Sequence, residues 1–201
     1  MASVTFYFDL GSPFAYLTAE RLAGGFLPEP IAWQPVLLGG LFAATGRSSW
    51  SVGDCARRRS GIAEIERRAR SYGLEPLRWP EDWPANTLTA MRAATYALSA
   101  GRVREFALAA FRAAFALGRD LTDPQHIWEA GEASGLARAQ LEAATQDPAV
   151  KQALREATDG AHDRGVIGVP TVAIDDELFW GDDRLADAAA RLSVPSAQKR
   201  A

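Results

Sequence analysis

The chain of 201 residues contains a single cysteine, Cys55, and only two histidines. One cysteine cannot form an intrachain disulfide or a Cys-x-x-Cys pair, which excludes disulfide exchange by the chain's own thiols. We interpret Cys55 as a small, partly buried residue, with a reactive thiol as the alternative. His126 and His162 show no ligand spacing with it, so we expect no bound metal. A lone cysteine fits a reducing compartment, and we expect a cytoplasmic protein.

An excess of positive charge and long apolar runs are also missing. The 22 Lys and Arg residues face 25 Asp and Glu residues, a net charge of -3, so there is no basic footprint for nucleic acid. No apolar run approaches the roughly 20 residues that span a bilayer. Residues 1–10 also lack the charged start of a secretory signal. We therefore expect neither a nucleic-acid nor a membrane partner.

The start of the chain reads as strand, helix and strand. Residues 4–9, Val-Thr-Phe-Tyr-Phe-Asp, combine β-branched and aromatic side chains, as is typical of a central strand. Ser12 suits a helix N-cap and Pro13 suits the first helical position, where its missing N–H costs nothing. Residues 31–36 form a second strand. This order predicts a right-handed βαβ unit with parallel strands.

The middle of the chain, from about residue 41 to 158, is rich in alanine, leucine, arginine and glutamate. Glycines that end helices and prolines that start them recur through it. Residues 86–99 and 103–117 have the apolar spacing of amphipathic helices, and 134–144 and 147–159 indicate two more. We expect this block to be helical throughout.

The end of the chain reads as hairpin and helix. Thr171–Ile174 and Leu178–Trp180 are short apolar runs around an Asp-Asp-Glu turn, the pattern of a β-hairpin. Asp182 and Asp183 then open a last helix, whose N-terminus favours acidic side chains. Each of the two either caps that helix or accepts the ammonium group of a ligand.

A βαβ half and a ββα half that enclose a helical block predict an α/β protein with a thioredoxin-like fold. We expect residues 1–40 and 160–201 to form the thioredoxin-like domain and residues 41–159 to form an inserted all-helical domain. In such a fold the turn at Ser12 lies next to the loop at Pro170. Pro170 is then either a trans edge residue or a cis-proline that turns the backbone of Val169 toward a ligand.

Ser12 also has two interpretations. It is a plain N-cap, or it is a hydrogen-bond donor that stabilises the thiolate of a ligand together with the positive helix N-terminus. Both a donor and the helix end favour the charged form of a thiol and lower its pKa. With the Val169-Pro170-Thr171 segment present, the active role is favoured.

Phe8–Leu17, FDLGSPFAYL, resembles the 2-hydroxychromene-2-carboxylate isomerase family, which is related to kappa-class glutathione transferases and to DsbA-like thioredoxin proteins. The similarity continues through residues 35–42 and 86–93. It is strongest at residues 165–171, GVIGVPT, and 178–185, LFWGDDRL. The resemblance covers nearly the whole chain in order. It implies a DsbA-like and kappa-transferase-like fold, glutathione as cofactor, a small aromatic substrate and a homodimer.

The resemblance also implies roles for matching residues. Ser12 would activate the glutathione thiol, and Val169, which precedes a cis Pro170, would hold the cysteinyl part through its backbone. Asp182 and Asp183 would hold the γ-glutamyl end.

Two further sets of residues follow from the resemblance. Arg47 lies in the loop that would cover glutathione, where the run Arg-Ser-Ser-Trp departs from the asparagine or glutamine, prolines and lysine of relatives. The substrate pocket would be formed by four residues: Pro13, Phe14, Trp50 and Asn86.

The implied function is glutathione-dependent isomerisation of 2-hydroxychromene-2-carboxylate or trans-o-hydroxybenzylidenepyruvate in aromatic catabolism, through reversible addition of the glutathione thiolate. A kappa-class-like glutathione transferase, which releases a conjugate, is the first alternative. A non-catalytic thiol-binding module is the second. Ser12 and the single cysteine argue against a disulfide oxidoreductase.

Overall fold

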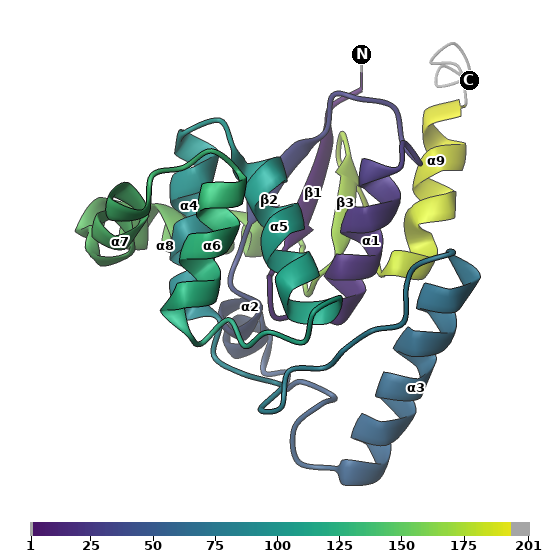
Figure 1. Cartoon of the computed structure of the whole chain (residues 1–201). Coiled ribbons are helices and arrows are strands. Elements are labelled where there is room, and N and C mark those ends of the chain that lie inside the picture. The colour runs from purple at the N-terminus through teal and green to yellow at the C-terminus, as the bar shows by residue number, and fades with distance from the viewer. Residues whose placement is uncertain (1, 194–201) are drawn as a thin grey trace.

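The computed structural model describes residues 2–193, which form a 4-stranded mixed sheet with helices on both faces (Figure 1). Its strands are β1 (Val4–Phe8), β2 (Ala32–Pro35), β3 (Thr171–Ile174) and β4 (Glu177–Trp180), in the order β2-β1-β3-β4. β1 is parallel to β2 and antiparallel to β3, and β3 is antiparallel to β4. The α/β thioredoxin-like fold is confirmed.

The two faces of β1 pack against different helices. Phe6 and Phe8 point to one face, where their rings stack at 5.5 Å and meet Trp33 of β2. The helices α1 (Pro13–Ala23) and α5 (Val103–Phe115) belong to the same apolar cluster. Tyr7 points to the other face and packs near Ala161 of α8 (Pro148–Asp163). Because β1 is covered on both sides, its sequence is an almost unbroken apolar run.

The remaining helices largely follow the sequence prediction. They are α2 (Leu38–Thr45), α3 (Cys55–Ser71), α4 (Leu88–Ser99), α6 (Pro124–Ala133), α7 (Arg138–Gln146), the short 3₁₀ helix η1 (Asp182–Arg184) and α9 (Leu185–Ser193). The helix expected over 134–144 begins only at Arg138, because Gly135 has a positive φ and ends the preceding helix. The domain limits stay a prediction, and residues 194–201 lie outside the described part.

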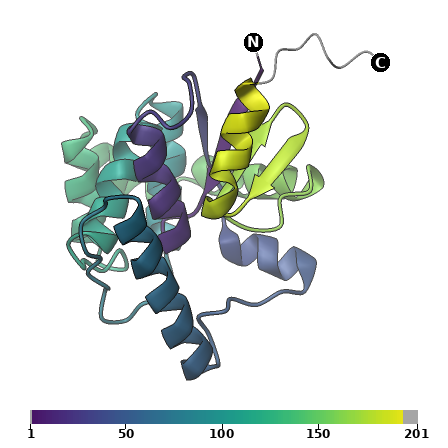
Figure 2. The ribbon, with the colours of Figure 1, turned by 90° about the vertical axis from the view of Figure 1, so that its right-hand side faces the viewer.

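The N-terminal half of helix α3 projects from the body of the protein, whereas Ile65 and Ala69 in its C-terminal half are buried in the core (Figures 1 and 2). Cys55 is its first residue and is exposed, so the expectation of a partly buried cysteine was wrong: the N-terminal half of α3 has little to pack against. The loop before α3 is held by Trp50. A Cβ placed on Gly61 of α3 would lie 2.1 Å from the Trp50 ring, so only glycine leaves room there.

Within residues 2–193, none of the helices combines the length and the apolar character needed to cross a bilayer.

Candidate active site

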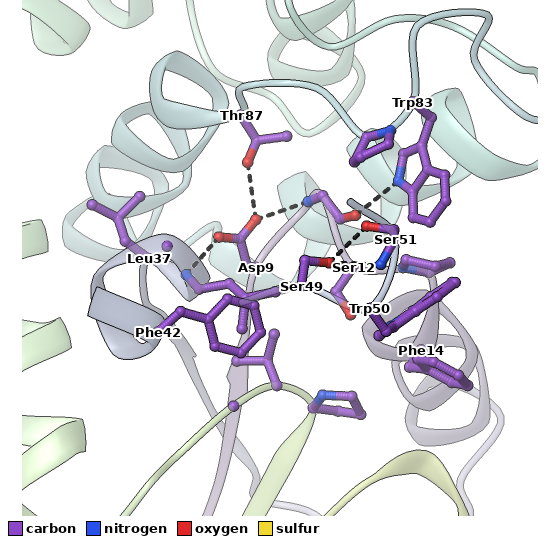
Figure 3. Close-up of a pocket in the computed structure, with 18 of the residues that line it drawn as sticks. Asp9, Ser12, Phe14, Leu37, Phe42, Ser49, Trp50, Ser51, Trp83 and Thr87 are labelled. Atoms are coloured by element: carbon purple, nitrogen blue, oxygen red, sulfur yellow. Dashed lines mark hydrogen bonds between the residues drawn. The ribbon is translucent and has the colours of Figure 1, made fainter. Parts of the chain in front are cut away.

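A cavity of about 670 Å³ opens where the turn after β1 and the loop before β3 face the segments 49–51 and 83–88 (Figure 3). Sites for small organic ligands commonly have this volume. Nine of the ten residues predicted for the site line this cavity: Ser12, Pro13, Phe14, Trp50, Asn86, Val169, Pro170, Asp182 and Asp183. The tenth, Arg47, is not among the lining residues; its guanidinium lies 5.2 Å from the ring centre of Trp180, which does line the cavity.

Ser12 is the N-cap of α1, as expected. Its Oγ accepts a hydrogen bond from the backbone N–H of Ala15 at 3.3 Å, and the residue is only 4% exposed. Its hydroxyl proton has no acceptor in the part of the chain that the structure describes. A buried donor with a free proton at the positive end of an 11-residue helix is suited to hold an anionic atom. The thiol-activating role of Ser12 stays a prediction.

The peptide bond between Val169 and Pro170 is cis, as expected from the thioredoxin-like context. The carbonyl of Pro170 accepts a hydrogen bond from the Gly181 N–H, and the Thr171 hydroxyl donates to the Gly168 carbonyl. By contrast, neither the N–H nor the C=O of Val169 bonds to any described residue. Since Val169 lines the cavity, its backbone is available to pair with an extended ligand.

Asp9 is a site residue that sequence reasoning treated only as the end of a strand. Its carboxylate is 4% exposed and accepts hydrogen bonds from the backbone N–H groups of Gly11 and Leu38 and from the Thr87 hydroxyl, at 2.8 to 3.0 Å. Burial raises the pKa of Asp9, and the three donors oppose that shift. One carboxylate therefore joins the Ser12 turn to α2 and to the start of α4. A carboxylate directly after an apolar strand was the available signal.

Asp182 does not cap a helix. It is 1% exposed, and its two carboxylate oxygens accept from the Arg68 guanidinium at 2.7 Å and the Tyr72 hydroxyl at 2.9 Å, while its carbonyl accepts from Arg21. Burial raises its pKa and Arg68 opposes this. Arg68 also pairs with Glu64 on its own helix, and its contact with Asp182 was not predicted from the sequence.

Asp183 differs from its neighbour. Its side chain is 61% exposed, it lines the cavity, and its nearest cation is Arg68 at 3.5 Å. The sequence alone assigns the same two possible roles to both aspartates. Of the two, Asp183 is the one whose carboxylate is accessible to the ammonium group of a ligand.

Aromatic rings form one side of the cavity. The Trp50 ring lies 6.0 Å from Phe14 and 5.7 Å from Trp83, and the Trp83 indole N–H donates to the Gly11 carbonyl. Trp79 is not among the lining residues; it packs behind Trp83 at 4.8 Å. This side offers flat apolar surface to an aromatic ligand.

The other polar lining groups are mostly committed to structure. The Asn86 side-chain oxygen accepts from the Leu88 N–H and so caps the start of α4. Neither His126 nor His162 lines the cavity, so no imidazole is placed to activate Ser12 as a nucleophile.

Comparisons with known proteins agree with this fold. The model of the DSBA-like thioredoxin domain family matches residues 3–193. A 2-hydroxychromene-2-carboxylate isomerase from Sphingobium xenophagum is 30% identical over 91% of this chain and 94% of its own length. A protein of the same name from Pseudomonas putida is 28% identical over 90% of each chain. The solved structure of a 2-hydroxychromene-2-carboxylate isomerase has a TM-score of 0.82 at 27% identity, covering 94% of this chain and 95% of that one.

Proposed function

The chain belongs to the DsbA-like thioredoxin family and, within it, to the 2-hydroxychromene-2-carboxylate isomerases. From this premise we propose that it is a glutathione-dependent isomerase that interconverts 2-hydroxychromene-2-carboxylate and trans-o-hydroxybenzylidenepyruvate. Relatives that carry the isomerase name over nearly their whole length support the reaction class. The observation that carries the proposal is Ser12, a buried hydroxyl with a free proton at a helix N-terminus inside a cavity.

The residues of the cavity fit glutathione. The free backbone N–H and C=O of Val169 suit its cysteinyl peptide unit, and the exposed carboxylate of Asp183 suits its α-ammonium group. Asp182 contributes indirectly, because its ion pair with Arg68 holds the turn that carries Asp183. The aromatic side of the cavity remains for the substrate.

When bound, glutathione supplies a thiolate that adds reversibly to the conjugated double bond of the ring-opened substrate, so that this bond can rotate. The chain's part is electrostatic. The Ser12 hydroxyl donates a hydrogen bond to the sulfur, and the N-terminus of α1 adds partial positive charge, so both favour thiolate over thiol. Asp9 keeps the Ser12 turn in place through the Gly11 N–H.

Two other reaction classes fit the cavity less well. Disulfide exchange needs a cysteine at the helix start, where this chain has Ser12, and its only cysteine, Cys55, does not line the cavity. Serine hydrolysis needs a base beside Ser12, and no histidine lines the cavity.

The test is to follow the absorbance of trans-o-hydroxybenzylidenepyruvate with purified protein and glutathione. We expect conversion that requires glutathione but does not consume it, so that a small fraction of one equivalent brings all of the substrate to equilibrium with the product. Consumption of one glutathione for each substrate molecule would instead support a kappa-type transferase. No conversion, together with no binding of glutathione by calorimetry, would overturn the proposal.

A further inference from the structure

Two serines of the loop between α2 and α3 face the cavity side by side. The hydroxyl oxygens of Ser49 and Ser51 are 2.6 Å apart, and both residues line the cavity (Figure 3). The backbone N–H of Ser51 also donates to the Ser49 oxygen at 3.2 Å. Ser51 is only 5% exposed, and Ser49 is half-buried.

The number of protons in this pair leaves one of them free. Two hydroxyls carry two protons, and the contact between Ser49 and Ser51 uses one of them in either direction. The remaining O–H has no acceptor within residues 2–193. A buried donor without an acceptor is unfavourable. Where the free proton lies on the buried Ser51, an acceptor from outside the chain is therefore expected.

Several other side-chain donors on the cavity wall are already used. The Thr87 hydroxyl donates to Asp9, the Trp83 indole N–H donates to the Gly11 carbonyl, and Arg68 pairs with carboxylates. Asn86 is exposed to solvent, which competes for its amide protons. Among the described lining side chains, the hydroxyl donors left for a ligand are Ser12 and the Ser49–Ser51 pair.

The loop holds this pair next to the aromatic side of the cavity. Trp50 lies between the two serines in sequence, fits over Gly61, and contacts Phe14 and Trp83. A ring that stacks in this region would therefore carry its polar substituent close to the pair.

We propose that the Ser49–Ser51 pair is a binding subsite for an oxygen acceptor, a carbonyl or carboxylate, on an aromatic ligand. The inference deepens the proposed function and rests on it for the identity of the natural ligand, whose keto-acid end it assigns to this loop. In this proposal the Ser12 hydroxyl donates to the glutathione sulfur, and the serine pair donates to the substrate oxygen.

The test measures binding without glutathione, through quenching of tryptophan fluorescence, since Trp50 and Trp83 line the cavity. Three probes share one phenylpropene framework: trans-cinnamate carries a carboxylate, benzylideneacetone a ketone, and trans-β-methylstyrene no oxygen. In the double variant Ser49→Ala/Ser51→Ala, we expect the affinity for the ketone to fall about three- to ten-fold, the worth of one neutral hydrogen bond. The affinity for the carboxylate should fall by at least about ten-fold, because hydrogen bonds to charged groups are stronger. The hydrocarbon should bind within about two-fold of wild type.

Ser48→Ala is the matched control, because Ser48 lies in the same loop, is exposed and does not line the cavity. It should leave all three affinities unchanged. A loss for cinnamate alone assigns the subsite to carboxylates, and a loss for the ketone alone assigns it to carbonyls. An equal loss for all three probes, or for none, overturns the subsite. Because glutathione is absent, this result is independent of the isomerase assay.

Discussion

The cavity has two sides that are built in different ways. The strand side consists of residues 9–14, which follow β1, and residues 168–170, which precede β3. Backbone hydrogen bonds and the buried carboxylate of Asp9 hold this side in place. The loop side, residues 46–54 and α3, projects from the body and is attached mainly through side chains, among them Trp50 on Phe14 and Arg68 on Asp182.

The difference separates the chemistry from the choice of substrate. A reactive group gains from a rigid position, and Ser12 has one because it belongs to the first turn after a central strand. A side attached mainly by side chains can change its sequence without disturbing the sheet.

The largest effect is expected on the strand side. Ser12→Ala removes the donor to the glutathione sulfur, and we expect kcat to fall about 10²- to 10³-fold, as for the loss of a preorganised donor. The cost in unfolding free energy should be at most about 1 kcal/mol, because only a long cap bond is lost. Isomerase kinetics and urea unfolding measure the two quantities, and an unchanged thiolate titration of bound glutathione would remove Ser12 from the mechanism.

The next effect separates the two aspartates. Asp182→Asn leaves Arg68 without its buried partner, and we expect a loss of about 2–3 kcal/mol in unfolding free energy, less than for a fully buried pair because Glu64 remains. Asp183→Asn should change stability by at most about 0.5 kcal/mol. It should nevertheless weaken glutathione binding by about ten-fold, through loss of a charge-assisted hydrogen bond. Calorimetry with both variants checks this, and equal behaviour of the two would contradict the division of roles.

The packing of Trp50 against α3 within the loop side can be tested by substituting Gly61. A methyl group there would overlap the Trp50 ring, so Gly61→Ala should destabilise the protein by about 1–3 kcal/mol and shift tryptophan emission. Gly160→Ala is the matched control, because Gly160 also lies inside a helix but has nothing within 4 Å of the added carbon. It should stabilise by about 0.5–1 kcal/mol. If both variants were stabilised, Trp50 would not be seated on Gly61.

The smallest effect is a pH dependence of the strand side. Burial raises the pKa of Asp9 in the folded state. At a pH just above the usual aspartate pKa, Asp9 is therefore still protonated in the folded state but already deprotonated in the unfolded state. The stability of the wild type relative to Asp9→Asn should therefore be greatest below the usual aspartate pKa and should decline as the pH rises through the raised pKa. Urea unfolding of both proteins across this range measures it. A constant difference would show that the three donors cancel the effect of burial.

Much of the strand side could be predicted because its signals are local. The β-branched and aromatic run before Asp9, the Ser12-Pro13 helix start and the short hairpin after Pro170 each depend on neighbouring residues. In the helical block, by contrast, the predicted start of α7 was wrong, because Gly135 ends the preceding helix and α7 begins only after it.

Local signals in the sequence predict the order of elements and the position of Ser12, because propensity, capping and turn chemistry act within a few residues. Three contacts depend instead on the folded chain. Asp9 accepts hydrogen bonds from Leu38 and Thr87, Arg68 pairs with Asp182, 114 positions away, and the Ser49–Ser51 pair faces the cavity. Such contacts depend on how helices and loops pack over the sheet. Asp182 forms an ion pair with a residue 114 positions away, whereas its neighbour Asp183 is exposed to solvent, and their residue type alone does not distinguish them.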